Sequence, residues 1–203
     1  MLQAIALLCR RGERELFRDL DFALGAGEML LVGGRNGAGK TSLLRLVCGL
    51  DRPEAGEVRW AGENVRGRRD GHARAMAYLG HQNGVKDELT PLENLRASAA
   101  LADIPTNESA LRAALDRVGL ASCDDLPARH LSQGQKRRAA LARLMLADAG
   151  LWVLDEPLAS LDVDAVALLE SMLAAHLGRG GVAVLTTHQP LAMRPTREVH
   201  IGD

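Results

Sequence analysis

The chain of 203 residues has the length of one domain, or of a core with a small subdomain. Its content of 47% hydrophobic and 25% charged residues excludes collagen-like, disordered and disulfide-scaffold proteins. Because 25 basic residues face 26 acidic ones, the net charge of −1 gives no general attraction to nucleic acid or to an anionic membrane. Aromatic residues, at 2%, are too few for a platform that stacks nucleic-acid bases. We therefore expect no nucleic-acid partner.

Targeting and redox signals are also lacking in the sequence. No run approaches the ~20 apolar residues that span a bilayer, and no signal peptide is recognisable. The three cysteines share no close spacing and indicate small buried hydrophobes or free thiols (Cys9, Cys48, Cys123). We expect a cytoplasmic protein that cannot transport a solute across a membrane by itself.

Apolar runs and helix signals alternate along the chain. In chain order the patterns predict a strand at 29–32, a helix at 41–48, a strand at 57–60, a polar arginine-rich loop at 62–74 and a strand at 75–79. From 85 to 131 only helix signals occur, including a capping box at Thr90 and Glu93 and an amphipathic helix through Leu111 and Leu115. A helix at 132–147, a strand at 151–154, a helix at 163–177 and a strand at 182–185 follow. This order predicts an α/β fold with a parallel core sheet and an inserted α-helical subdomain at about 85–131, extending into the helix that starts at 132.

Residues 34–41 read Gly-Arg-Asn-Gly-Ala-Gly-Lys-Thr and match the phosphate-binding loop G-x-x-x-x-G-K-[ST]. Phosphate oxygens need several backbone N–H donors in a tight cradle, which side chains at the glycine positions would obstruct, and the helix N-terminus adds a favourable partial positive charge. Lys40 can reach the β- and γ-phosphates, and the Thr41 hydroxyl can ligate Mg²⁺. The expected nucleotide-binding residues of this loop are Arg35, Asn36, Gly37, Ala38, Gly39, Lys40, Thr41 and Ser42. The loop alone does not separate a kinase, a GTPase and a transport ATPase.

Two adjacent carboxylates, Asp155 and Glu156, follow the predicted strand 151–154. In a parallel sheet this strand end lies beside the phosphate-binding loop. Asp155 is placed to hold Mg²⁺, directly or through water. Glu156 is placed to orient, or to accept a proton from, the water that attacks the γ-phosphate.

Residues 131–135, Leu-Ser-Gln-Gly-Gln, lie upstream of the acidic strand and open a predicted helix. Here the chain resembles the ATP-binding subunits of ABC transporters, whose hallmark is Leu-Ser-Gly-Gly-Gln. Gln82 matches that family's glutamine loop, which senses Mg²⁺ and contacts the membrane partner, residues 159–162 match its dimer-contacting loop, and His188 matches its switch histidine. The resemblance implies one ABC ATPase domain over residues 1–203, a P-loop NTPase fold with a small antiparallel β portion beside the parallel sheet.

The resemblance also implies a site completed in trans by a homodimer. Ser132, Gly134 and Gln135 of one subunit would meet the γ-phosphate held by Lys40 of the other. ATP and Mg²⁺ are the implied cofactors. The implied catalytic residues are Glu156, His188 and Gln82, and the implied metal-binding residues are Thr41, Gln82 and Asp155.

Two positions depart from the family pattern. Gln133 replaces the first glycine of the motif, and we expect activity to persist because Ser132 and Gly134 are kept. Arg11 stands where the family usually has an aromatic ring against adenine; it either stacks on the base or is a solvated arginine beside Arg10. We predict weak discrimination of ATP over GTP.

Within the family, residues 78–86 and 186–191 resemble the short ATPase subunit of the bacterial cytochrome c maturation system. That branch implies a translocase ATPase at the cytoplasmic face of the bacterial inner membrane, peripheral to integral membrane subunits of that system. It would couple ATP hydrolysis to haem release, export or delivery and meet haem only indirectly. Gln82 and residues 85–95 would face the membrane partner. The alternatives are an ABC ATPase for another cargo, such as a lipid or drug, and a non-transport ABC ATPase acting on nucleic acid or ribosomes.

Overall fold

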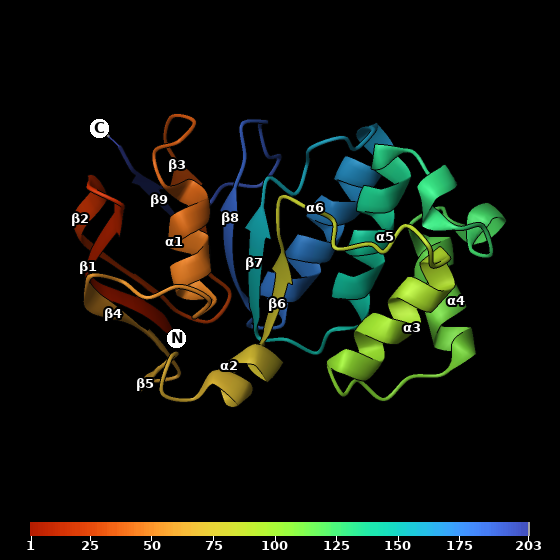
Figure 1. Cartoon of the computed structure of the whole chain (residues 1–203), viewed down its shortest axis with the longest axis horizontal. Coiled ribbons are helices and arrows are strands. Elements are labelled where there is room, and N and C mark those ends of the chain that lie inside the picture. Colours follow the sequence, from red (N-terminus) through yellow and green to blue (C-terminus); the bar gives the residue numbers. More distant parts are fainter. Residues whose placement is uncertain (203) are drawn as a thin grey trace. The chain divides into compact units, whose positions relative to one another are not determined.

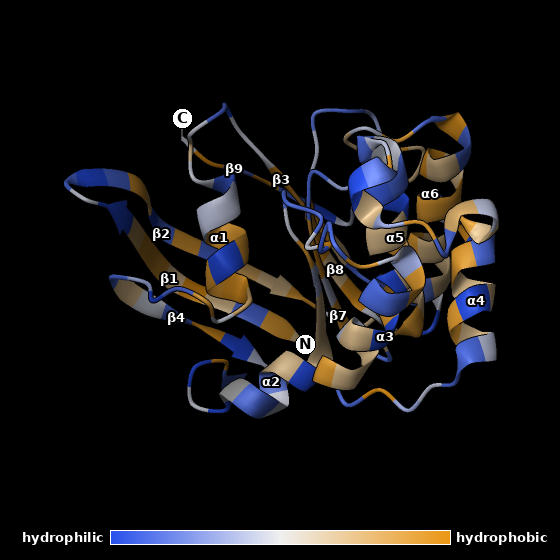
Figure 2. Ribbon diagram, turned by 45° about the vertical axis from the view of Figure 1, so that its right-hand side comes forward, coloured by the Kyte–Doolittle hydropathy of each residue, from blue (hydrophilic) through white to orange (hydrophobic). Residues whose placement is uncertain are grey.

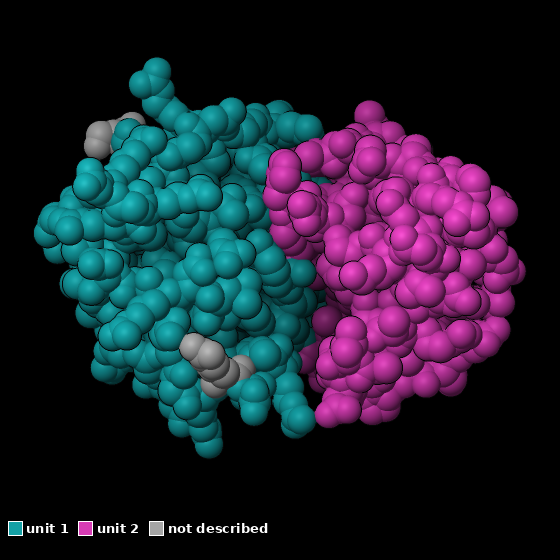
Figure 3. Space-filling view, in the orientation of Figure 1, with its two compact units in different colours: residues 1–78, 149–157, 173–203 teal, residues 79–148, 158–172 magenta. Residues whose placement is uncertain are grey.

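The computed structural model describes residues 1–202, with the side chain of Arg69 left out. The chain forms two compact units (Figure 3). Unit 1 comprises Met1–Tyr78, Ala149–Pro157 and the residues from Leu173 onward, and unit 2 comprises Leu79–Asp148 and Leu158–Met172. The segment 85–131 thus lies in unit 2, which also takes in the neighbouring residues on both sides and a second stretch after the acidic strand.

A five-stranded sheet in the order β6-β7-β8-β3-β9 carries the site (Figure 1). Its strands are β6 (Met76–Leu79), β7 (Leu151–Asp155), β8 (Val182–Thr186), β3 (Met29–Gly33) and β9 (Arg197–His200). β7 pairs with β8, β8 with β3 and β3 with β9, all in parallel. All five residues of β7 and of β8 are buried, as expected for parallel strands covered on both faces. The predicted strands at 29–32, 75–79, 151–154 and 182–185 are confirmed.

A second, antiparallel sheet has the order β2-β1-β4-β5. Its strands are β1 (Leu2–Arg11), β2 (Arg14–Leu24), β4 (Ala55–Trp60) and β5 (Glu63–Asn64). Hydrophobic and hydrophilic residues both occur along β1 and β2 (Figure 2). The small antiparallel β portion that the family resemblance implies is therefore present.

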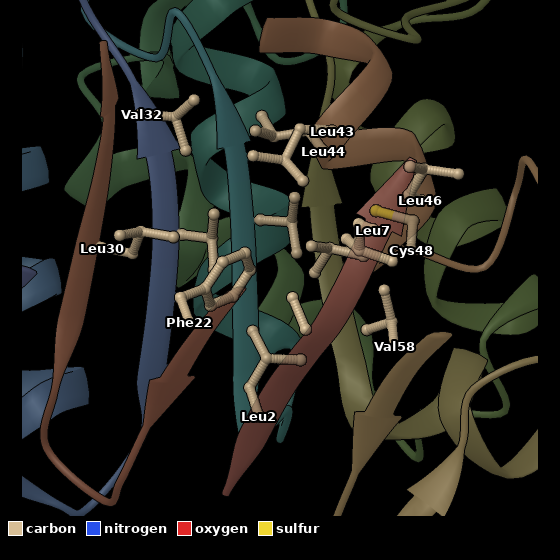
Figure 4. Close-up of a cluster of buried hydrophobic side chains, with 14 of the residues drawn as sticks. Leu2, Leu7, Phe22, Leu30, Val32, Leu43, Leu44, Leu46, Cys48 and Val58 are labelled. Carbon is tan, nitrogen blue, oxygen red and sulfur yellow. The ribbon is translucent and has the colours of Figure 1, made fainter. Parts of the chain in front are cut away.

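Helix α1 (Lys40–Val47) contacts β1 of one sheet and β7 and β8 of the other. Its buried face, Leu43, Leu44, Leu46 and Val47, joins the side chains of both sheets in one hydrophobic cluster (Figure 4). Burying a leucine fully stabilises a fold by about 1.5–3 kcal/mol. This core fixes the helix that begins directly after the phosphate-binding loop.

Unit 2 is helical, with α3 (Pro91–Leu101), α4 (Glu108–Arg117) and α5 (Gln133–Leu146), and two single 3₁₀ turns (Ala121–Cys123 and Ala128–His130). Helix α6 (Val163–Gly178) begins in unit 2 and ends in unit 1. The capping box predicted at Thr90 is confirmed: its hydroxyl accepts the Glu93 N–H at 3.1 Å, and the Glu93 carboxylate accepts the Thr90 N–H at 2.9 Å. The predicted helices in this part of the chain are confirmed by α3, α4, α5 and α6.

The prediction of a loop at 62–74 is wrong. This segment contains β5 and helix α2 (Arg69–Ala75). Helix α2 has no apolar stripe, and Gly71 lies in its middle, so the sequence gives no helical signal. A contact with a distant part of the chain holds this helix in place: Nε2 of the buried His72 ring lies 2.9 Å from the carbonyl oxygen of Val47, at the end of α1.

Within residues 1–202, no helix combines the length and the apolar content that crossing a membrane requires.

Candidate functional site

The phosphate-binding loop joins β3 to α1 and depends on backbone shapes that only glycine adopts easily. Gly34 has φ +131° and a Cβ built there would lie 2.3 Å from the carbonyl oxygen of Ile201, while Gly39 has φ +117° and its Cβ would lie 3.1 Å from that of Leu16. Gly39 is the N-cap of α1 and provides no side-chain cap. The first amides of α1 therefore lack partners within the helix and can bind an anion.

Lys40, in the first turn of α1, points its ammonium group back over the loop. Its Nζ donates to the carbonyl oxygens of Gly34 (2.7 Å) and Arg35 (3.4 Å) and lies 3.2 Å from Nε2 of His188. The same imidazole nitrogen lies 3.0 Å from Oδ1 of Asn36. The loop, its lysine and the histidine after β8 are therefore in direct contact in unit 1.

Asp155 ends β7 and is buried. Its Oδ2 accepts the hydroxyl of Thr41 at 2.8 Å, and its Oδ1 accepts the hydroxyl of Thr186 at 2.8 Å. Carboxylate and hydroxyl oxygens are the hard donors that Mg²⁺ prefers, and Mg²⁺ typically takes only one or two carboxylates from a protein together with substrate phosphates. The pair Thr41 and Asp155 thus fits a magnesium ion.

Glu156 has left-handed backbone, with φ +48°. Its N–H donates to the hydroxyl of Thr186 at 2.9 Å, and its Oε2 accepts the backbone N–H of His188 at 3.2 Å. Its Oε1 lies 3.5 Å from the imidazole Nε2 of His188. A non-glycine residue in this conformation persists only where its surroundings hold it, which makes the turn after β7 a strained and well-fixed element.

The three cysteines of the chain are not reactive. All three are free and buried. Burial raises the pKa of the Cys48 thiol to about 12, and it also raises the pKa values of Cys9 and Cys123. The thiols are therefore neutral, and the interpretation as small buried hydrophobes is confirmed.

Arg11 is exposed at the end of β1, where it pairs with Arg14 across the turn to β2. Leu16, which follows on β2, provides the contact with Gly39 described above. The hairpin that carries Arg11 therefore touches the phosphate-binding loop in unit 1. Whether the guanidinium stacks on a base remains a prediction.

Ser132 and Gln135 form a second capping box, at the start of α5. The Ser132 hydroxyl accepts the Gln135 N–H at 3.1 Å, and the Gln135 side chain accepts the Ser132 N–H at 2.8 Å. A Cβ on Gly134 would lie 2.9 Å from the carbonyl oxygen of Ser160. Within unit 2, the motif thus builds an exposed helix N-terminus and leaves no room for a side chain at Gly134.

Gln82 also belongs to unit 2, where its side chain is exposed. The neighbouring Arg137 is buried and donates to the carbonyl oxygen of Gly80 at 2.9 Å and to Oδ1 of Asn83 at 3.1 Å. This arginine therefore holds the backbone before Gln82 and the side chain that follows it.

Sequence reasoning assigned no role to two residues that contact the site. Thr186 ends an apolar strand and begins the segment 186–191 that carries the branch resemblance, and Ile201 follows β9, far from residues 34–41 in the sequence. Their contacts depend on strand order in the sheet, which no local pattern in the sequence indicates.

Comparisons with known proteins show the family to which the chain belongs. A family model described as ABC transporter matches residues 17–159. The chain belongs to the ABC transporter family. The ABC ATPase family hydrolyses ATP, and the predicted α/β P-loop NTPase fold and family resemblance are confirmed.

Individual relatives agree with this membership. The "Cytochrome c biogenesis ATP-binding export protein CcmA" of Dechloromonas aromatica (strain RCB) is 53% identical over 204 residues, covering 100% of both chains. A solved "Structure of ATP binding subunit of ABC transporter" is 26% identical with a TM-score of 0.83, over 92% of this chain and 79% of that one. The dimeric post-hydrolysis state of the ATP-binding cassette MJ0796, bound to ADP and phosphate, is 20% identical with a TM-score of 0.80, over 93% of this chain and 88% of that one, and shares the fold.

Proposed function

We propose that this chain is the ATP-hydrolysing subunit of an ABC transport complex in c-type cytochrome biogenesis. It couples ATP hydrolysis to haem release, export or delivery through integral membrane subunits, as a translocase ATPase. The observation that carries the enzymatic part is the contact of Glu156, His188 and Lys40 at the N-terminus of α1. The branch is supported by the full-length identity of 53% to a cytochrome c biogenesis export protein.

The loop and the first turn of α1 bind the phosphates. The uncapped amides and the positive end of α1 attract phosphate oxygens, and the ammonium of Lys40 neutralises the β- and γ-phosphates. The remaining nucleotide-binding residues of the loop in our proposal are Arg35, Asn36, Gly37, Ala38, Gly39, Thr41 and Ser42. Arg11 contacts the adenine ring in this proposal.

Thr41 and Asp155 hold Mg²⁺, and Gln82 completes the set in our proposal. When bound, this ion supplies charge neutralisation and orientation of the phosphate oxygens. The hydroxyl oxygen of Thr41 and Oδ2 of Asp155 already lie 2.8 Å apart, so the two proposed ligands are close together before the ion binds.

Glu156 is the general base. Its carboxylate takes a proton from a water molecule as the water oxygen bonds to the γ-phosphorus and the bond from that phosphorus to the ADP oxygen breaks. The backbone N–H of His188 holds Oε2 of Glu156, and its imidazole lies between Glu156, Lys40 and Asn36. His188 therefore orients the base and can donate a hydrogen bond to the γ-phosphate.

The site is completed by a second copy of the chain. The helix N-terminus at Ser132, with Gly134 and Gln135, faces the γ-phosphate of the other subunit, so residues 1–203 act as one ABC ATPase domain in a homodimer. Gln82 and residues 85–95 meet the membrane subunits. The chain is thus peripheral on the cytoplasmic face of the bacterial inner membrane, and haem is handled by the partners.

The test uses a strain that lacks its own cytochrome c biogenesis ATPase, carrying this chain with its membrane subunits. Glu156→Gln keeps the size of the side chain and removes the base, so ATP hydrolysis by the purified complex should fall at least ~100-fold. Covalently bound haem in c-type cytochromes should disappear, while nucleotide binding stays and an ATP-bound dimer accumulates. Glu54→Gln, which neutralises an exposed glutamate before β4, is the matched control and should behave as the wild type.

Two results would contradict the proposal. Unchanged hydrolysis in Glu156→Gln, with the membrane subunits present, would refute the role of Glu156 as base. Normal cytochrome c maturation in a strain whose complex cannot hydrolyse ATP would refute the biogenesis role and leave another cargo as the alternative.

A further inference from the structure

Thr186 is the last residue of β8, and its side chain is completely buried. Its hydroxyl makes two hydrogen bonds to residues at the end of the neighbouring strand β7, one to its last residue and one to the residue that follows. It donates to Oδ1 of Asp155 at 2.8 Å, and it accepts the backbone N–H of Glu156 at 2.9 Å. One oxygen atom thus connects the two adjacent acidic residues of the site.

The bond to Asp155 fixes the rotation of its carboxylate. With Oδ1 held by Thr186, Oδ2 is directed to the hydroxyl of Thr41, which it accepts at 2.8 Å. Thr41 lies in the first turn of α1, so the carboxylate is held between β8 and the phosphate-binding helix. Outer partners of this kind orient a carboxylate that ligates a metal.

The bond to Glu156 holds a strained turn. The φ of +48° at Glu156 is unfavourable for an L-residue and needs support from its surroundings. The Thr186 hydroxyl holds the amide of Glu156, and the backbone N–H of His188 holds its carboxylate. The end of β8 therefore fixes Glu156 at both its backbone and its side chain.

Packing alone does not require a threonine here. Val182 and Val184 occupy buried positions on the same strand, and a valine at 186 would have nearly the same shape. A hydroxyl in a fully buried site is unfavourable unless it is hydrogen-bonded. The polar atom at this position is therefore explained by its two bonds to the acidic pair.

We propose that Thr186 is a positioning residue for ATP hydrolysis, which acts by orienting the carboxylate of Asp155 and by holding the backbone turn at Glu156. This inference rests on the proposed ATPase function of the site. Thr186 acts through the carboxylate of Asp155 and the backbone amide of Glu156, the two groups that its buried hydroxyl holds. It has no part in binding the phosphates, which falls to Lys40 and the amides of α1.

The test compares Thr186→Val and Thr186→Ser in the full chain purified with its membrane subunits. Thr186→Val should lower kcat roughly 10- to 100-fold and weaken Mn²⁺ binding, followed by electron paramagnetic resonance in the presence of ADP, by a similar factor. The KM for ATP and the affinity for ATP in EDTA should change less than about threefold, because the phosphate contacts remain. Thr186→Ser keeps the hydroxyl and should restore kcat to within about threefold of wild type.

The matched control is Thr196→Val in the same unit. The Thr196 hydroxyl also accepts a backbone N–H, from Met29 at 3.1 Å, but it contacts neither Asp155 nor Glu156 in the described part of the chain. Its removal should leave kcat and Mn²⁺ affinity unchanged. Unlike Thr186, Thr196 is exposed. A comparable loss of kcat in Thr196→Val would overturn the inference, because the loss of any threonine hydroxyl that accepts a backbone N–H in this unit would then have the same effect.

Three other outcomes would overturn the inference. These are a kcat within twofold of wild type in Thr186→Val, equal losses in Thr186→Val and Thr186→Ser, or a loss confined to ATP affinity. If Thr186→Val does not fold, Thr186→Ala and Thr186→Ser replace it, and equal kcat in these two refutes the role of the hydroxyl. Failure of the proposed function is distinguishable, because wild type and Glu156→Gln would then show the same hydrolysis.

Discussion

Replacement by alanine should destabilise the protein more at Gly34 than at Gly37, two glycines of the phosphate-binding loop. Gly34 and Gly37 both have positive φ, +131° and +77°. A Cβ at Gly34 would lie 2.3 Å from the carbonyl oxygen of Ile201, whereas a Cβ at Gly37 would meet no atom within 4 Å. Alanine strains the backbone at both positions, more at φ +131°, and only at Gly34 does it also clash with the segment after β9.

The magnitudes follow from these contacts. In Gly37→Ala the left-handed backbone costs about 1–2 kcal/mol, and the stiffer unfolded chain returns about 0.4–1 kcal/mol. Gly34→Ala must also displace a backbone carbonyl, and such overpacking adds about 1–3 kcal/mol. For a chain of this size each kcal/mol lowers Tm by about 2–4 °C, so Gly34→Ala should melt clearly below Gly37→Ala.

The assay is urea denaturation without nucleotide, so that the role of the loop in binding phosphate does not enter. In a chain that ends at His200 the Ile201 carbonyl is gone, and the extra loss in Gly34→Ala should shrink, leaving only the larger backbone strain at φ +131°. Equal losses for the two variants in the full chain would refute the reasoning. A difference that truncation leaves unchanged would refute the assignment of the clash to Ile201.

Three further predictions concern other parts of the chain. Burial lowers the pKa of His176, whose ring stacks on Trp152 with the ring centroids 4.2 Å apart. The neutral imidazole therefore stabilises the fold fully above about pH 6.5, and this stabilisation is lost as the pH falls toward the folded-state pKa. His176→Phe should flatten the decline of unfolding free energy between pH 7 and 5, and an unchanged slope would count against this prediction. Ser132→Ala and Asn107→Ala each remove the side chain that caps a helix of unit 2 and should each cost about 1 kcal/mol of stability, but only Ser132→Ala should lower hydrolysis by the complex; equal hydrolysis in both variants would contradict the role in trans. If the arginine is solvated, Arg11→Ala should leave the weak preference for ATP over GTP unchanged. A strong preference for ATP in the wild type that this variant abolishes would refute weak discrimination and support stacking of Arg11 on the base.

The local elements of the fold could be predicted because their signals lie within a few residues of one another. The capping box predicted at Thr90 needs only two side chains and two amides three residues apart, and the helix predicted to start at Ser132 begins with a box of the same spacing. The phosphate-binding loop needs glycines at fixed spacing between a strand and a helix. Such patterns are complete in the sequence, and the structure has the corresponding elements.

Other elements escaped prediction for physical reasons. In β1 the pairing shifts between Ala4 and Leu7, and Ala6 has φ +45°, so the alternation of buried and exposed residues breaks. β9 has four residues, three of them exposed, and gives no period. Helix α2 is held by the contact of His72 with Val47 and not by an apolar face. In each case the stabilising contact comes from a distant part of the chain.

The sequence by itself determined the family and contained the phosphate-binding loop motif. It also predicted Lys40, Asp155, Glu156 and His188 as site residues, because each belongs to a short motif of that family. Only the tertiary structure decided which atoms hold these groups in place. Thr186 lies between the two carboxylates because β8 is the neighbour of β7, as the parallel pairing of Asp155 with Thr186 records. The Ile201 carbonyl lies behind Gly34 because β9 pairs with β3. Strand order is set by packing of the whole core, and no window of the sequence contains it.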